Sequence, residues 1–423
     1  MGRMAKERTT SQPKPVEKFE LSEKHIGWRI LFFILFVVIA ATAFAYGINS
    51  LFTTEPGWQE IEADAAAGVN CGNEFVLMYH LGISGRDATV ENKALKIIYT
   101  DACELAYKLF HNKEIFDDVT NICYINQHPN EEIVVDDALY QAFSIIQRNG
   151  DRRLYLGPVY DQYEEIFYCE DDTMLVNYDP LLNEELAAEY AMIADYANNP
   201  QMIDIKLLDD NKIMLEVSKE YLAFAEEHYI TQYIDFFWMK NAFVTDYLAD
   251  TLIENGYTAG TISSYDGFSR NLGKMEESFS FNIYDRMGQT IYPAAVMQYS
   301  GTRSIVYLRD YMMNNQDEEH YYVMEDGTIR TSYIDVNDGI AKTATDNLYA
   351  YSEQLGCAEL LLKAAPVYVT DDFSEEAVKE LTASGVYIIY CEDNTIKYND
   401  ASLVLTDLFD ESGITYKKAY VGK

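Results

Sequence analysis

One late stretch of the chain combines residue types that could hold a metal ion beside a phosphate ester. Residues 320–356 begin with His320, pass a glycine turn at Gly327 and continue in a run rich in β-forming residues. The spacing after that run predicts a helix that carries Asp346 in its first turn and ends at Gly356. The carboxylate of Asp346 could coordinate a hard cation such as Mg²⁺. It could also simply cap the helix and interact favourably with its dipole.

Motifs of several common enzyme classes are absent from the sequence. The chain has no GxSxG nucleophile motif, no GxxxxGK[ST] phosphate loop and no HExxH zinc motif. Its cysteines have no CxxC spacing, so they predict no zinc site, and most are expected to be small buried hydrophobic residues. They are Cys71, Cys103, Cys123, Cys169, Cys357 and Cys391.

The elements that must position these residues mix helix and strand without regular alternation. Periodicity predicts strands at 74–82, 278–285, 290–300, 304–313, 366–372, 385–394 and 395–399, and a strand from 153 that turns at 157–158. It predicts a hairpin at 202–217 and helices at 91–112, 135–149, 180–200, 220–256 and 375–384, with Gly256 as a helix stop. This pattern indicates the α+β class, with one large domain over 72–423 and ample core.

Two segments in the middle of the chain carry a family resemblance. In YIDFFWMKNAFVTD (233–246), Asp235 and Asp246 stand at the two aspartate places of a helix entry that resembles the ApbE family, the FAD:protein FMN transferases. Asn241 occupies that family's lysine place, and Lys240 lies one residue early. The family's Gly-Gly flavin loop corresponds to TISSYDGFSR (261–270), in which the glycine pair has become Tyr265-Asp266 or Asp266-Gly267. A tyrosine at that place obstructs the approach of backbone amides to an anionic ligand.

The resemblance continues toward the C-terminus and spans roughly residues 72–400. Ser300-Gly301 is similar to the family's Ser-Gly. The family's His-Ile-x-Asp-Pro-x-Thr-Gly resembles HYYVMEDG (320–327), where the first and last residues keep their places and Val323, Met324 and Asp326 replace Asp, Pro and Thr. The family's Ala-Asp-x-x-x-Thr resembles the segment from 345, where Asp346 and Gly356 fit and Ala350 replaces the threonine.

This resemblance implies an activity and a set of site residues. The family cleaves the pyrophosphate of FAD and attaches FMN to a threonine of a target protein with a divalent metal, so FAD and Mg²⁺ are the expected cofactors. The implied partner is an exported protein that carries the acceptor threonine. The implied roles are catalysis by His320, flavin contacts from Asp246, Asp266, Gly267, Ser300 and Gly301, and metal binding by Asp346.

Simpler interpretations stay open for the same residues. His320 follows an acidic run and could form a salt bridge in a solvated loop, Asp235 could be a cap, and Asp246 could be an exposed helical aspartate. Because Asp346 lacks the threonine four residues later, its metal shell is incomplete. A second hypothesis is therefore a catalytically inactive ApbE-like domain that binds flavin or a partner protein. A third is a structural surface domain that shares only the fold.

Charge and composition exclude one class of partner. The formal net charge is −37, whereas nucleic-acid binders need a basic face to displace counterions from phosphate. We therefore expect no nucleic-acid partner. The hydrophobic content of 48% is that of a globular protein, and 35 tyrosines favour extensive half-buried sheet.

The N-terminal region predicts the location of the protein. Residues 30–48 carry no charge and have about the length needed to cross a bilayer core. Basic residues predominate in the preceding polar tail at 1–29, which predicts a cytoplasmic N-terminus, a single-pass anchor at 30–49, a juxtamembrane spacer at 50–71 and an extracytoplasmic domain. The alternative is a signal peptide cleaved near Ala43-Phe44-Ala45, with secretion of the rest.

Overall fold

The computed structural model describes residues 26–52, 54–64, 73–275, 278–411 and 413–422. The chain divides into two compact units, Met1–Thr54 and Glu55–Lys423. The first unit contains helix α1 (Ile26–Phe52), of which the side chains of residues 27–28 and 31–42 are described. Within the described part of the chain, no helix is long and apolar enough to cross a membrane. The tail expected before α1 lies outside the described residues.

A sheet of nine strands forms the centre of the second unit. Neighbouring strands are antiparallel except for the last pair, which is parallel. In spatial order the strands are β1 (Gly57–Ile61), β2 (Phe75–Leu81), β6 (Gly260–Ser264), β7 (Phe268–Asn271), β10 (Ser304–Arg309), β13 (Asn347–Ser352), β14 (Tyr387–Glu392), β15 (Thr395–Tyr398) and β19 (Lys417–Tyr420). Every residue of β10 and β13 is buried, so both faces of the sheet are covered at its middle.

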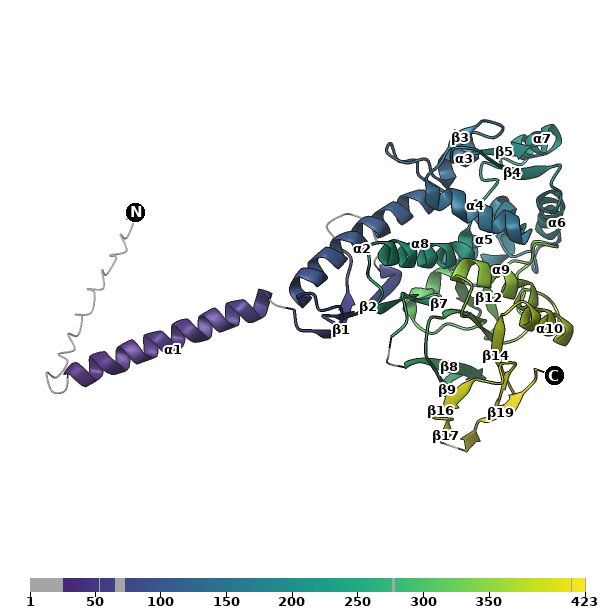
Figure 1. Ribbon diagram of the computed structural model, residues 1–423. Coiled ribbons are helices and arrows are strands. Elements are labelled where there is room, and N and C mark those ends of the chain that lie inside the picture. The colour runs from purple at the N-terminus through teal and green to yellow at the C-terminus, as the bar shows by residue number, and fades with distance from the viewer. Residues whose placement is uncertain (1–25, 53, 65–72, 276–277, 412, 423) are drawn as a thin grey trace, which may run out of the picture. The chain divides into compact units, whose positions relative to one another are not determined.

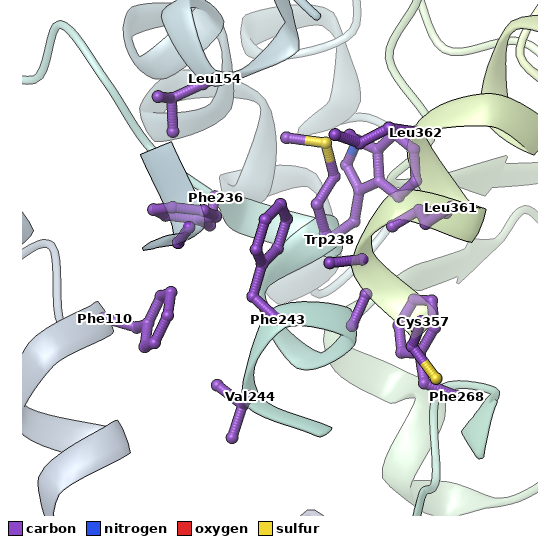
Figure 2. Packing of buried hydrophobic residues seen from close by; sticks show 14 of the residues in the cluster. Phe110, Leu154, Phe236, Trp238, Phe243, Val244, Phe268, Cys357, Leu361 and Leu362 are labelled. Carbon is purple, nitrogen blue, oxygen red and sulfur yellow. The ribbon is translucent and has the colours of Figure 1, made fainter. Parts of the chain in front are cut away.

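Helices cover one face of this sheet (Figure 1). Helix α8 (Lys240–Glu254) contacts β6 and β7, α9 (Cys357–Tyr368) contacts β10 and β13, and α2 (Ala88–Phe110) packs on α8. Figure 2 shows part of the core between them, where the rings of Phe110 and Phe243 lie 5.0 and 4.9 Å from the ring of Phe236. Helix α10 (Glu375–Ala383) packs beside α9.

A second, smaller core fills the opposite face. It lies between the central sheet and a three-stranded sheet of β16 (Val404–Thr406), β9 (Thr290–Tyr299) and β8 (Phe279–Met287). Tyrosine is the most frequent of its buried residues, and the rings of Tyr307 and Tyr349 stack with centroids 4.1 Å apart. Their hydroxyls bond within the layer, for example from Tyr349 to the carbonyl of Tyr284 at 3.0 Å.

The rest of the second unit consists of a helical region with a small sheet, and of short elements. The larger pieces are α3 (Ile122–Gln127), α4 (Asp137–Asn149), α5 (Gly157–Tyr163), α6 (Glu184–Asn198), α7 (Lys219–Glu227), and a sheet of β3 (Ile133–Val134), β5 (Lys212–Val217) and β4 (Ile203–Leu208). The short ones are η3 (Arg153–Leu156), η4 (Glu164–Tyr168), η5 (Leu175–Asn177), η6 (Phe237–Met239), η7 (Asn315–Glu319), β11 (Tyr321–Val323), β12 (Ile329–Thr331), β17 (Asp410–Glu411) and β18 (Ile414–Thr415). The mixed α+β class is confirmed.

The strand predicted from residue 153 is wrong. Residues 153–168 form η3, α5 and η4 in succession. Pro158 lies in the first turn of α5, where its missing N–H is not needed and its fixed φ suits the helix. Gly157 is required because a Cβ there would lie 2.8 Å from the backbone nitrogen of Ile234.

The helix predicted to carry Asp346 is also wrong. Asp346 precedes strand β13, and Gly356 does not end a helix but is the N-cap of α9. Residues 347–352 pair with β10 on one side and β14 on the other, and this pairing overrides their weak helical spacing. The strand predicted at 366–372 is also wrong, because residues 366–368 are the end of α9, Val369 is its C-cap and residues 370–372 form bends.

Candidate functional site

The second unit contains a cavity of about 540 Å³ at the start of α8, a size within the usual range for small-ligand sites. Its walls come from the end of α2, the segment 235–241, the turn between β6 and β7, and the elements η4 and η7. Its lining is rich in charged, polar and aromatic side chains, which include Glu74, His111, Asn112, Lys113, Glu164, Tyr168, Asp235, Phe237, Lys240, Tyr265, Asp266, Glu319 and His320.

Asp235 forms the first wall and fixes the entry to α8. Its carboxylate accepts hydrogen bonds from the backbone N–H of Phe237 at 2.9 Å and from Nδ2 of Asn112 at 2.6 Å. The first bond supports a left-handed backbone at Phe237, where φ is 42°, which is uncommon for a non-glycine residue. Burial raises the pKa of Asp235 to about 6. Asp235 therefore closes the turn that leads into η6, whereas the N-cap positions of η6 and α8 are occupied by Phe236 and Met239.

The turn between β6 and β7 forms the second wall. Tyr265 projects its partly exposed side chain into the lining, and burial raises the pKa of the neighbouring Asp266 to about 6. One carboxylate oxygen of Asp266, Oδ1, has no hydrogen-bond partner among the described residues. Gly267 lies behind the turn with φ of 114°, and a Cβ there would be 2.3 Å from the carbonyl oxygen of Tyr307. Glycine is therefore required at 267 for the fold, whatever the ligand.

His320 forms the third wall directly after η7. Burial lowers its pKa, with a further contribution from the charge of Lys240, so the imidazole is neutral at pH 7. Its Nδ1 is buried and has no hydrogen-bond partner within the described chain. The acidic run before His320 suggested that this histidine forms a salt bridge. Among the described residues, His320 forms none.

A buried arginine connects the second and third walls. The guanidinium of Arg309 donates to a carboxylate oxygen of Asp317 in η7 at 2.6 Å. It also donates to the backbone carbonyls of Tyr265 at 3.3 Å and Asp266 at 3.4 Å. Both partners of the ion pair are almost completely buried. The backbone N–H of His320 in turn donates to the carbonyl of Asp317 at 2.9 Å, so Arg309 and Asp317 together position the cavity turn and the histidine.

The cavity lining is acidic. Five carboxyl groups, those of Glu74, Glu164, Asp235, Asp266 and Glu319, face two ammonium groups, those of Lys113 and Lys240. Both lysines form ion pairs, Lys113 with Glu164 and Lys240 with Glu74 at 3.2 Å. The carboxylates would repel an additional phosphate charge inside this lining. A neutral ring with N–H donors could instead donate hydrogen bonds to them.

Asp246 does not line the cavity. Its carboxylate accepts the backbone N–H groups of Cys357 at 2.8 Å and Ala358 at 2.9 Å, and Arg270 donates to it at 2.9 Å. Asp246 therefore caps α9 from the neighbouring helix and is buried rather than exposed. A Cβ on Gly356 would lie 2.4 Å from Oδ2 of Asp246, which explains the glycine at position 356.

The remaining residues implied by the resemblance are also apart from the cavity lining. Ser300 is exposed, and Gly301, with φ of 86° and open space around it, belongs to the turn between β9 and β10. Asp346 is half-exposed, 3.8 Å from Arg286, and its carbonyl accepts the backbone N–H of Asp310. The structure thus brings together Asp266 and His320, and leaves Asp246, Ser300, Gly301 and Asp346 elsewhere.

A metal centre of the expected kind does not fit this arrangement. Within the described ranges, no three His, Cys, Asp or Glu residues are grouped so that they could hold a metal ion. Asp346 is not on a helix face with a second oxygen one turn later, and its near neighbour is a guanidinium. We therefore assign no reaction step to a metal. The five described cysteines are all free thiols.

Several cavity residues belong to no motif that is recognisable in the sequence. Asn112 and Lys113 reach the cavity from one segment after α2 and Glu164 reaches it from η4, and none of the three has a recognisable spacing. Arg309 also belongs to no such motif, although an arginine within an otherwise apolar strand of the sequence SIVYLR is a signal for a buried ion pair.

Comparisons with known proteins locate this architecture among solved folds. No family model matches the chain, and no curated protein sequence matches it. Solved structures do match. The ApbE protein of Thermotoga maritima aligns with a TM-score of 0.53 and 13% identity, over 83% of this chain and 97% of that one. The flavin transferase ApbE of Vibrio cholerae aligns with a TM-score of 0.53 and 12% identity, over 85% of this chain and 98% of that one. A histidine-to-glycine mutant of the same protein aligns with a TM-score of 0.52 and 13% identity, over 82% of this chain and 98% of that one. The chain therefore has the fold of the ApbE flavin transferases.

Proposed function

We propose that the Glu55–Lys423 unit binds FAD at the cavity and transfers FMN from it to a threonine hydroxyl of a partner protein. The observation that carries the proposal is the convergence of three separate segments on one cavity: the helix entry at 235–241, the turn at 265–266 and His320. The resemblance relates each of these segments to the flavin site of ApbE transferases, and the fold supports the relation.

The character of the lining favours a particular orientation of FAD. Aromatic side chains of Tyr107, Phe110, Phe237 and Tyr265 supply apolar surface, and the carboxylates of Asp235 and Asp266 supply acceptors. A heteroaromatic ring that carries N–H groups satisfies both features. The same carboxylates repel a pyrophosphate, so we propose that one ring of FAD enters the cavity and the phosphates stay outside its acidic interior.

The proposed transfer is a displacement at phosphorus. The threonine oxygen forms a new bond to the phosphorus of the FMN half, and the bond from that phosphorus to the bridging oxygen breaks, so that AMP leaves with the bonding electron pair. The hydroxyl proton must pass to a base. His320 is the candidate, because it lines the cavity and burial lowers its pKa, so that the imidazole is unprotonated at pH 7.

A second candidate function is flavin binding without transfer. It is favoured by the lack, within the described ranges, of a three-residue metal cluster, since divalent cations neutralise charge in most phosphoryl transfers. In this alternative the cavity holds a flavin nucleotide as a resident or regulatory ligand.

One experiment separates the two. The full chain is incubated with FAD, with and without Mg²⁺, and with a peptide that carries a central threonine. FAD affinity is measured by flavin fluorescence, and transfer by covalent flavin on the peptide and release of AMP. Transfer supports the first function, with His320→Asn expected to keep FAD affinity and lose the label. Affinity without label or AMP leaves only flavin binding, and absence of FAD affinity would overturn both.

We also propose that the domain is held outside the cytoplasm by the apolar segment at 30–49, with its partner exported to the same compartment. The support is the uncharged run at 30–48 with a predominantly basic segment before it. Protease added to intact cells should degrade the domain, and protection from protease until lysis would contradict this location.

A further inference from the structure

Exposed apolar side chains lie on the outer surface beside the cavity. Four of them, called the rim patch, are Tyr168 at the end of η4, Met174, Val176 in η5 and Val323 in β11. Their exposed fractions are 64%, 37%, 47% and 51%. Tyr168 also lines the cavity, so the rim patch reaches the cavity itself.

Hydrogen bonds hold the segments of the rim patch together. The hydroxyl of Tyr322 donates to Oδ1 of Asp172 at 3.0 Å, and the backbone N–H of Glu325 donates to its Oδ2 at 3.0 Å. Asp172 thereby fixes the loop that carries Met174 against the β11 turn. β11 also packs directly against η4 and η7. The apolar side chains therefore belong to one fixed surface rather than to independent loops.

The margin of this surface is acidic. Residues 164–181 and 313–329, which carry the rim patch and its surroundings, contain no lysine or arginine. Their acidic side chains include Glu170, Asp171, Glu319, Glu325 and Asp326. The charge of Glu319 raises the pKa of the Tyr168 phenol, after the larger effect of burial, which indicates that acidic charge lies close to the apolar side chains. An apolar centre within an acidic margin is complementary to a segment with apolar and basic side chains.

We propose that the rim patch docks a segment of the partner protein in which apolar residues and lysine or arginine flank the acceptor threonine. This inference rests on the proposed function, because it assigns the surface that presents the threonine to FAD. Single exposed hydrophobic residues are normal on proteins, but here four lie on neighbouring segments that Asp172 joins, and acidic side chains outnumber Lys113, the basic group whose charge also acts on Tyr168. Electrostatic attraction would steer the basic segment, and hydrophobic contact with the rim patch would retain it.

The test uses the full chain and two fluorescent peptides with a central threonine. One alternates lysine with valine and leucine, and its twin has glutamate in place of every lysine. In fluorescence anisotropy we expect the basic peptide to bind at least about tenfold more tightly than its twin, and to weaken as salt is added. Val323→Asp combined with Tyr168→Ser should reduce the affinity for the basic peptide about tenfold.

A matched control distinguishes this surface from general attraction to an acidic protein. Val134→Asp alters a side chain that is 59% exposed on β3 and lies outside the rim patch, so it should leave peptide affinity unchanged. Equal losses from Val134→Asp and from the rim variant, or equal affinity for the two peptides, would overturn the docking surface. FAD affinity is measured on the same samples. Loss of FAD binding with intact, rim-dependent peptide binding would overturn the proposed function and leave the docking surface standing.

Discussion

The carboxylate of Asp246 in α8 accepts the backbone N–H of Cys357 at 2.8 Å and so caps a helix that begins 111 residues later. The second oxygen accepts the N–H of Ala358, which satisfies another free donor of the first turn of α9. Arg270 compensates the buried charge from β7. One side chain thus joins α8, α9 and the central sheet behind the cavity, so its main effect is on the framework that positions the site.

Replacing Asp246 by alanine should therefore destabilise the protein without a specific effect on FAD. The loss of the cap and the exposure of two buried amides should reduce the free energy of unfolding by about 2 kcal/mol, measured by urea denaturation. Asp250→Ala is the control, because Asp250 also binds Arg270 but is largely exposed and should cost less than about 0.5 kcal/mol. Unchanged stability with weakened FAD binding would instead support the flavin contact that the sequence predicted.

Local chemistry made several elements predictable. The helix predicted at 135–149 is α4, whose N-cap Asp136 accepts the N–H of Ala138 at 2.9 Å, and the predicted helix stop Gly256 follows the C-cap of α8 with φ of 80°. The turn at 209–211 has Asp210 and Asn211 in the left-handed region, as a tight hairpin requires. In each case the signal is short-range and is carried by residues whose backbone preferences differ from the average.

The position of the histidine motif, placed at 320–327, was harder to predict, because the spacing of the family's pattern fits two segments of the chain. The pattern His-Ile-x-Asp-Pro-x-Thr-Gly also fits SYIDVNDG at 332–339, where Asp335 and Gly339 keep the aspartate and glycine places. In this register the carboxylate of Asp335 accepts the N–H of Asn337 at 3.0 Å, and Gly339 has φ of 75° with Tyr190 packed against it. The sequence alone could not choose between the registers, since the choice depends on strand pairing and close packing with distant residues.

The buried pair of Arg309 and Asp317 gives a second prediction. Asp317→Ala leaves an uncompensated guanidinium in the core and removes the acceptor for the N–H of Met313, so it should cost about 3 to 5 kcal/mol in the free energy of unfolding. Because the pair positions the turn at 265–266 and the loop of His320, FAD affinity should also fall in the fraction that stays folded. Glu318→Ala, on the exposed side of η7, is the control and should leave stability nearly unchanged.

Asp266 predicts a dependence of stability on pH. Its pKa is raised from an ordinary value near 3.8 to about 6 in the folded protein, so the folded state binds more protons than the unfolded state between these values. Stability should therefore fall as pH rises from about 4 to about 6, and stay at the lower level above that. Asp266→Asn should remove this contribution and stabilise the protein at pH 7 by about 3 kcal/mol, with little effect at pH 4.

The comparison for that prediction is Asp101→Asn at an exposed position of α2, which should have the same small effect at both pH values. Urea denaturation at pH 4, 5, 6 and 7 measures the slope. A greater stabilisation by Asp266→Asn at pH 4 than at pH 7 would have the wrong sign for a buried carboxyl and would contradict the assignment.

Tyr265 stands where the resembling family has a glycine of its flavin loop, and variants of Tyr265 can show whether its ring helps or hinders the binding of FAD. If a heteroaromatic ring enters the cavity, the phenol ring can stack on it, and Tyr265→Ala should weaken FAD binding by about 1 kcal/mol, or roughly fivefold, while Tyr265→Phe binds as the original protein does. If the tyrosine instead obstructs an anionic ligand, Tyr265→Gly should strengthen binding. Flavin fluorescence titration of the three variants separates these outcomes, because stacking depends on the ring, and obstruction is relieved by its removal. The acidic lining beside Tyr265 makes the first result the expected one, since removing the ring would leave carboxylates and no apolar surface for FAD to contact on that wall.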